Sequence, residues 1–271
     1  MYRGTESGNT AEVNFVRNFN SNKTSENFSY YIESLNLSDL KNIYMIRVTS
    51  KQFSKLSNQI VMTRADAYLI KTTDKRINEL LFKNNYYIDE NILRENKINY
   101  TYIEFSGISI KMSDSNNFQI LKLTPESFYS LFKEYDLGAG ASIYCQKEEE
   151  LIKNDLVFKG WKTSKNNIIK KYSTEIPNLL KLTHNISTSE ELYIYKQLKD
   201  FSNKKIAEII NKSKYLQEII FNGFHIYEEP YSASYFYHGH QIEKLDYIPF
   251  TITTGSGRSK GNFTIVLKPK K

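Results

Sequence analysis

One aspartate and one lysine have the type and placement that phosphodiester chemistry requires. Asp66 lies in the run ADAYLI (65–70), and Lys111 ends the run GISIK (107–111). Side chains alternate between the faces of a strand, so Ser109 and Lys111 should point the same way. If the two strands pair, Asp66 and Lys111 can lie side by side at one end of a sheet. A carboxylate and an ammonium there could hold a divalent cation and a water against a phosphodiester.

Three glutamates are candidates to complete such a site. Glu104 is the nearest to Lys111 along the chain, but strand alternation puts it on the opposite face unless a bulge near Gly107 shifts the register. Glu12 and Glu126 lie in expected helices, where a glutamate near the start also complements the helix dipole. An Asp–Lys pair between strands is itself more often a surface ion pair. The ranking is Asp66 and Lys111, then Glu12 and Glu126, then Glu104.

The expected elements that would position these residues alternate between strands and helices. Strands are expected at 43–49, 65–70 and 100–112, the last interrupted at Ser106-Gly107, and at 247–254 and 262–268 around a Gly-rich turn. Helices are expected behind an N-cap at Asn9, at 74–85, from Thr124 onward and across 187–221. This order predicts an α/β (α+β) protein with a mixed central sheet flanked by helices and an added helical and β lobe.

Composition narrows the function classes. The 271 residues are 40% hydrophobic and 14% aromatic, which argues against a disordered chain. A single cysteine, Cys145, excludes a disulfide framework and a Cys-based metal site, which leaves oxygen ligands and a hard cation such as Mg²⁺. No run reaches the roughly 18 apolar residues of a membrane span and no signal-peptide core is visible, so a cytoplasmic protein without a membrane partner is expected.

The charge balance narrows the function classes only a little further. Lys and Arg number 37 against 30 Asp and Glu, a net charge of +7. Asn, Ile, Lys and Tyr are abundant and can all be encoded by AT-rich codons, so an AT-rich genome alone could produce much of this excess. The basic balance therefore favours a polyanionic partner only modestly.

The motifs resemble those of the type II restriction endonucleases of the PD-(D/E)xK nuclease superfamily. The resemblance covers nearly half of the chain, from the helix containing Gly8-Asn9-Thr10-Ala11-Glu12 through SKQFSKLSNQIVMTRADAYLI and SGISIKMS to the helix at Glu126. Two positions depart from the family pattern: Ala65 stands before Asp66 in place of proline, and Ser109 stands where an acid usually precedes the lysine. Some family members with Ser-x-Lys take a glutamate from the following helix, here Glu126, and the first helix often contributes another, here Glu12.

The resemblance implies an Mg²⁺-dependent endonuclease that cuts double-stranded DNA at a short, palindromic sequence. It implies a homodimer and a companion DNA methyltransferase that protects the host DNA. Residues 1–137 would form the catalytic core, and residues 138–271 a helical and β-hairpin DNA-recognition portion packed on it in one compact domain. Lys111 would position the hydrolytic water, and the expected metal ligands are Asp66, Glu12 and Glu126. The expected DNA contacts are Lys51, Ser54, Ser109, Arg258, Ser259 and Lys260.

Two alternatives stay open from the sequence. The first is a non-catalytic, sequence-specific DNA-binding protein in which Asp66 and Lys111 are a surface ion pair. The second is a restriction enzyme that excises bases without a metal. An endonuclease and a DNA-binding protein both bind DNA in a salt-sensitive way. Only the endonuclease cuts plasmid DNA when Mg²⁺ is present.

Overall fold

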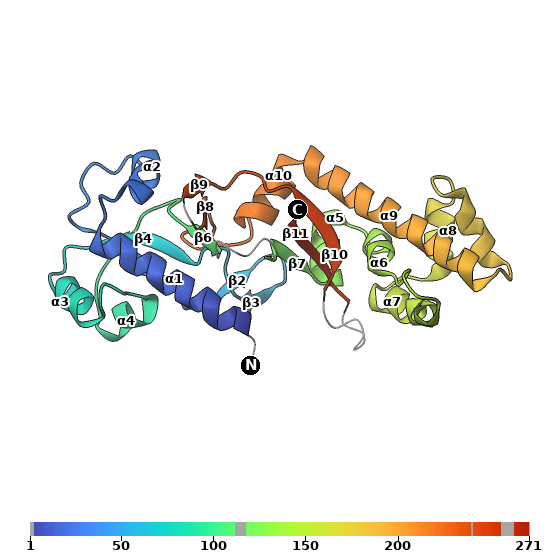
Figure 1. The fold of residues 1–271 in the computed structure, drawn as a ribbon, viewed down its shortest axis with the longest axis horizontal. Coiled ribbons are helices and arrows are strands. Elements are labelled where there is room, and N and C mark those ends of the chain that lie inside the picture. Colours follow the sequence, from blue (N-terminus) through green and yellow to red (C-terminus); the bar gives the residue numbers. More distant parts are fainter. Residues whose placement is uncertain (1–2, 112–117, 240, 256–262, 271) are drawn as a thin grey trace. The chain divides into compact units, whose positions relative to one another are not determined.

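The chain folds into two compact units, each built from two separate segments (Figure 1). The computed structural model describes residues 3–111, 118–239, 241–255 and 263–270, with side chains from residue 8 onward. The first unit comprises Met1–Phe118 and Glu218–Ile248, and the second comprises Gln119–Gln217 and Pro249–Lys271. This division differs from a boundary after residue 137, because residues 235–238 pair with the first sheet and residues 121–123 with the second.

A six-stranded sheet forms the centre of the first unit. The strands on its main path are β1 (Ile43–Arg47), β4 (Ala67–Lys71), β6 (Ile108–Lys111), β8 (Tyr235–His238) and β9 (Ile242–Lys244), in the order β1-β4-β6-β8-β9, and β5 (Thr101–Tyr102) pairs with β4. Neighbouring strands are antiparallel except β6 and β8, which run parallel. The sheet is therefore mixed, as the sequence predicted.

Helices cover both faces of this sheet. On one face, α1 (Arg3–Ser21) and α2 (Glu26–Ser34) pack Phe15, Phe19 and Tyr31 against Met45, Leu69, Ile108 and Ile110. On the other, α3 (Arg76–Lys83) and α4 (Glu90–Glu95) pack Ile77, Leu81 and Leu93 against Tyr44, Ile46, Tyr68 and Ile70. Alternate residues of β1 and β4 enter opposite cores, because side chains along a strand point to alternate faces. The expected fold class is confirmed.

Two local expectations are corrected. Helix α1 begins at Arg3, upstream of the expected cap at Asn9, so Asn9 and Glu12 both lie inside the helix. The strand expected over 100–112 is divided into β5 and β6, with a turn at residues 104–105 between them. The interruption expected at Ser106-Gly107 therefore separates two strands.

A short hairpin precedes Asp66, the residue directly before β4. It consists of β2 (Gln52–Ser54) and β3 (Gln59–Val61), which pair only with each other among the described strands. The Lys55 N–H donates to the Ile226 carbonyl at 3.1 Å, and the Tyr227 hydroxyl donates to the Met62 carbonyl at 3.1 Å. The hairpin is thus fastened to the segment that follows η3 (Glu218–Asn222), a short π-helix.

The second unit combines a three-stranded antiparallel sheet with helices. Its strands are β7 (Leu121–Leu123), β10 (Phe250–Thr254) and β11 (Ile265–Pro269), in the order β10-β11-β7. Its α-helices are α5 (Pro125–Phe132), α6 (Asp136–Ser142), α7 (Asn154–Gly160), α8 (Lys165–Tyr172), α9 (Thr188–Lys212) and α10 (Lys214–Gln217), and its 3₁₀ helices are η1 (Glu148–Lys153) and η2 (Pro177–Thr183). The small residues of α6 let Trp161 approach closely, since a Cβ at Gly138 would lie 2.1 Å from its ring.

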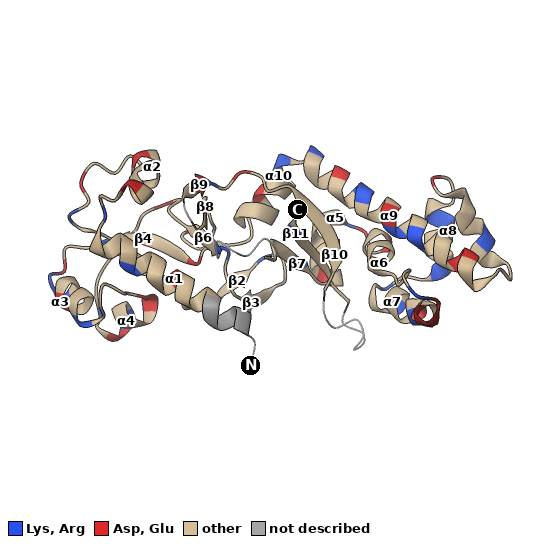
Figure 2. Ribbon diagram, viewed as in Figure 1, with Lys and Arg blue, Asp and Glu red and all other residues tan. Residues whose placement is uncertain are grey.

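Charged residues are spread rather than gathered along the longest helix. Figure 2 shows both signs interspersed along α9, whose sequence contains five lysines among its acids. None of the helices in the described part of the chain is long and apolar enough to cross a bilayer.

Candidate active site

Asp66 and Lys111 meet at one end of the central sheet. The Lys111 Nζ lies 3.2 Å from Asp66 Oδ2. The same oxygen accepts hydrogen bonds from the Ile110 N–H at 2.6 Å and from the Ser109 hydroxyl at 3.3 Å. The two charged side chains are partly open to solvent, with 21% of Asp66 and 26% of Lys111 exposed. A ligand can therefore reach them.

Strand pairing explains why these two residues, far apart in sequence, come together. The Asp66 N–H donates to the Ile108 carbonyl at 2.8 Å, and Ala67 stands opposite Ile108 in the antiparallel pair of β4 and β6. The Asp66 carbonyl also accepts from the Val48 N–H at 2.9 Å, so the backbone on both sides holds it. The placement of Asp66 beside Lys111 agrees with the expectation from strand alternation.

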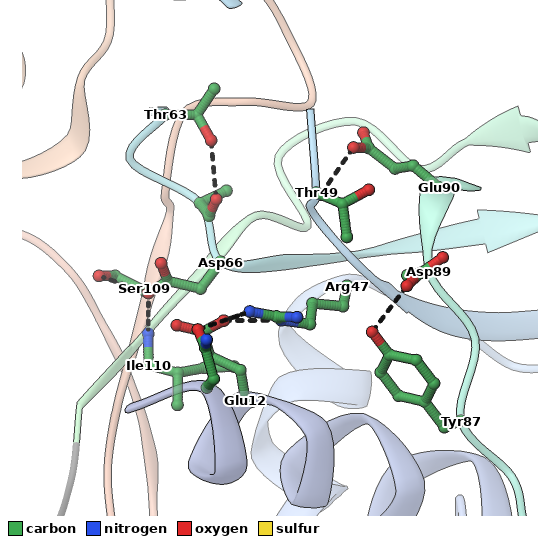
Figure 3. A network of polar contacts seen from close by, with 12 residues as sticks. Glu12, Arg47, Thr49, Thr63, Asp66, Tyr87, Asp89, Glu90, Ser109 and Ile110 are labelled. Atoms are coloured by element: carbon green, nitrogen blue, oxygen red, sulfur yellow. Dashed lines mark hydrogen bonds and ion pairs between the residues drawn. The ribbon is translucent and has the colours of Figure 1, made fainter. Parts of the chain in front are cut away.

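Glu12 reaches the same place from helix α1. Its Oε2 accepts a hydrogen bond from Arg47 Nε at 2.7 Å, and Arg47 also donates to Asn9 Oδ1 at 2.9 Å. Figure 3 shows the side chains of Glu12 and Arg47 lying beside Asp66 and Ser109. Arg47, at the end of β1, thus holds the Glu12 carboxylate of α1 near the carboxylate of Asp66, which directly precedes β4.

The two carboxylates influence each other electrostatically. Burial raises the pKa of Glu12 above its ordinary value, and the negative charge of Asp66 raises it further, while Arg47 and Lys111 partly oppose this rise. Two nearby carboxylates repel each other when both are ionised. A divalent cation bound between them would relieve this repulsion.

The donor set suits a hard cation. One oxygen of each carboxylate, Asp66 Oδ1 and Glu12 Oε1, accepts no hydrogen bond from any residue that the structure describes. Within that same part of the chain, no group of three or more His, Cys, Asp or Glu side chains gathers to enclose a metal. Mg²⁺ is commonly held by one or two carboxylates together with waters and substrate phosphates, so two acids are sufficient.

The other two expected acids are in different structural elements. Glu126 is in α5, in the second unit, where its carboxylate pairs with Lys162 at 3.1 Å and is 62% exposed. Burial acts to raise the pKa of Glu126, but hydrogen bonds from its own backbone and from Lys162 outweigh this effect and lower the pKa. Thr124 caps this helix as expected, accepting from the Ser127 N–H at 3.2 Å. Glu104 is exposed in the turn between β5 and β6.

The expected DNA contacts differ in their exposure to solvent. Lys51 is exposed just before β2. Ser54 and Ser109 are buried, at 2% and 4% exposed, and Ser109 donates to Asp66. Their hydroxyls therefore do not face solvent, and Ser109 supports the aspartate instead. The remaining expected contacts, Arg258, Ser259 and Lys260, lie outside the described residues.

Arg47 is a site residue that the sequence did not single out. Its guanidinium makes the hydrogen bonds to Glu12 and Asn9, and its backbone N–H donates to the Ile88 carbonyl at 3.0 Å. The available signal was one charged residue ending the apolar strand IYMIR. That signal does not distinguish a site residue from an ordinary exposed strand end.

Comparisons with known proteins yield one structural similarity. No protein-family model matches the sequence, and no curated protein matches it. The structure is similar to the crystal structure of restriction endonuclease MspI in complex with its cognate DNA, with a TM-score of 0.45 and 13% sequence identity. The match covers 98% of this chain and 90% of that chain.

Proposed function

We propose that this chain is a type II restriction endonuclease that hydrolyses phosphodiester bonds in double-stranded DNA at a short, specific sequence with Mg²⁺. The observation that carries the proposal is the meeting of Asp66, Lys111 and Glu12 at one end of the central sheet. An exposed ion pair alone would be a weak reason, because such pairs are common on surfaces. A second carboxylate beside the pair, with one oxygen of each acid unpaired among the described residues, suits a cation site.

Each residue of the site would have its own role in hydrolysis. Asp66 and Glu12 would hold the divalent cation, which when bound offsets charge on the scissile phosphate and lowers the pKa of a bound water. Lys111 would orient the attacking water and contact the phosphate oxygens as they gain charge. The water oxygen bonds to phosphorus, the ester oxygen leaves, and a proton ends on that oxygen. The Ile110 N–H and the Ser109 hydroxyl keep Asp66 in place.

The same proposal includes a homodimer and a companion methyltransferase. A two-fold dimer matches a palindromic site and brings one active site to each strand. The second unit, with its helices and three-stranded sheet, is the proposed source of base recognition, and methylation of the recognised sequence would protect the host DNA. The DNA contacts proposed outside the active site are Lys51, Arg258, Ser259 and Lys260.

Incubation of the purified chain with unmethylated plasmid tests the proposed activity. With Mg²⁺ we expect discrete fragments with uniform ends, and with EDTA we expect intact plasmid, because the carboxylates alone cannot offset the phosphate charge. Mapping the fragment ends would give the recognition sequence and the cut position together. Salt-sensitive binding without any cleavage would favour the non-catalytic DNA-binding protein, and cleavage that resists EDTA would favour base excision.

A Glu12→Gln variant tests which glutamate binds the metal. Gln keeps an oxygen that accepts from Arg47 but removes the negative charge that would attract the cation. The Mg²⁺ concentration for half-maximal cleavage should therefore rise at least about tenfold, because even changes in residues behind the metal ligands commonly weaken metal binding by about 10–100-fold. Cleavage rates across an Mg²⁺ titration measure this shift.

The matched control for Glu12 is Glu126→Gln, in the other glutamate proposed as a ligand. It should titrate like the wild type if Glu12 completes the site. The opposite pattern, an unchanged Glu12→Gln and a shifted Glu126→Gln, would assign the ligand to α5 instead.

A further inference from the structure

Three large apolar side chains lie exposed on one face of the β2–β3 hairpin. Phe53 is 55% exposed, Ile60 69% and Met62 60%. Phe53 and Ile60 stand directly opposite each other in the antiparallel pair, and Met62 follows Ile60 by two positions, on the same face. We call Phe53, Ile60 and Met62 the apolar hairpin face.

The opposite face of the hairpin is buried at Ser54, which is 2% exposed, and Leu56 in the turn is 8% exposed. The backbone bonds to Ile226 and Tyr227 hold both strands, and the N–H of Ala65, just beyond the hairpin, donates to the Tyr231 carbonyl at 3.1 Å. A register slip that would turn the three apolar side chains inward is therefore opposed, and the face is held out toward solvent.

An exposed apolar cluster of this kind indicates a partner. Isolated exposed apolar residues are ordinary, but a contiguous group marks a surface that is covered in use. A second copy of the chain is a poor candidate for this face, since stable dimers bury about 20–30 residues on each side and a two-stranded hairpin offers far fewer.

The charges around the face suit a polyanion. Lys51 and Lys55 lie one residue outside the two ends of β2, on either side of Phe53, and both are exposed. Residues 51–65 contain no Asp or Glu. Met62 precedes Asp66 by four residues, so the chain can separate them by at most about 14 Å. A polyanion on this face would therefore lie beside the proposed cleavage site.

We propose that the apolar hairpin face inserts into a groove of duplex DNA beside the scissile phosphate and partly unstacks one base step. This inference rests on the proposed function, because it requires that the chain bind duplex DNA. Phe, Ile and Met are among the side chains that act as wedges between base steps in DNA-bending proteins. Lys51 and Lys55 would contact the phosphates on either side and limit sliding of the wedge.

A Phe53→Trp variant reports on insertion directly. The native Trp161 is fully buried, at 0% exposed, so acrylamide quenches mainly an indole introduced on the hairpin. The probes are short duplexes cut from unmethylated plasmid, with EDTA present to prevent metal-dependent cleavage and anisotropy to confirm binding. DNA should shield the introduced indole from acrylamide. In the anisotropy assay, Phe53→Ala should weaken DNA binding about tenfold, which is the typical effect of losing one stacking contact.

Phe82 provides the matched control, since it is 85% exposed on α3. Phe82→Trp should stay equally quenchable with and without DNA, and Phe82→Ala should bind DNA like the wild type. If anisotropy confirms DNA binding and the indole at position 53 still stays open to acrylamide, the insertion of the hairpin face is wrong. The proposed function is then unaffected. Shielding without DNA, together with a doubled mass in light scattering, overturns it in favour of a second copy. Failure of the wild type to bind any duplex overturns the proposed function as well.

Discussion

An Asp66→Asn protein is expected to lose Mg²⁺-dependent cleavage by about 10³-fold while it keeps its fold and its DNA binding. The substitution removes the negative charge that would hold the cation, and losing about 4 kcal/mol of transition-state stabilisation corresponds to that factor. Asparagine keeps a side-chain oxygen that can accept from the buried Ile110 N–H. Single-turnover cleavage rates measure the loss, and anisotropy with labelled duplexes measures binding.

The comparison with Asp66→Ala separates chemistry from stability. Alanine leaves the Ile110 N–H without its acceptor, at a cost of about 1–3 kcal/mol in the free energy of unfolding. Urea unfolding should therefore show a destabilised Asp66→Ala and a nearly wild-type Asp66→Asn, while both lack cleavage. If Asp66→Asn cleaves DNA as fast as the wild type, the Asp66 carboxylate has no role in catalysis.

The parts of the fold that were predictable are those with a strong local signal. The strands expected at 43–49 and 65–70 are β1 and β4, with bounds shifted by one or two residues, and Thr124-Pro125 starts α5 as its capping chemistry requires. The cap at Asn9 was wrong, because a good capping residue can also lie within a longer helix. That error matters for Glu12, since a glutamate in the interior of α1 gains little from the helix dipole, whose effect is confined to the first turn.

The division into two units was not predictable from local patterns. The parallel pairing of β6 with β8 joins residues 108–111 to 235–238, and nothing near either strand specifies that register. The path of the chain between them builds most of the second unit. Long-range pairing of this kind depends on the packing of the whole unit, so local sequence patterns do not reveal it.

The site was partly predictable for the same physical reason. Strand alternation is enough to place Lys111 and Ser109 on one face, and pairing then brings Asp66 to them. The choice among the glutamates was not available, because it depends on where α1 crosses the sheet and on Arg47 at the end of β1. Ser109, which is buried, donates a hydrogen bond to Asp66 from that shared face.

Lys111→Ala should reduce cleavage by about 10²–10⁴-fold, the usual effect of removing a group that assists proton transfer or stabilises developing charge. Its thermal stability should hardly change, because a partly exposed ion pair contributes only about 0–1 kcal/mol to the free energy of unfolding. If the pair were a surface ion pair without a catalytic role, Lys111→Ala would cleave at the normal rate. Single-turnover rates at saturating Mg²⁺ and melting temperatures together distinguish the two roles.

Lys111→Arg sharpens this test. Arginine keeps the positive charge beside Asp66 but places it on a planar, permanently protonated group with fixed donor directions, whereas lysine offers a compact ammonium that can change its protonation. If Lys111 only neutralised Asp66, the arginine variant would cleave nearly as fast as the wild type. Because we assign Lys111 to the attacking water and the phosphate oxygens, we expect the arginine variant to keep DNA binding and stability but to recover little of the cleavage rate.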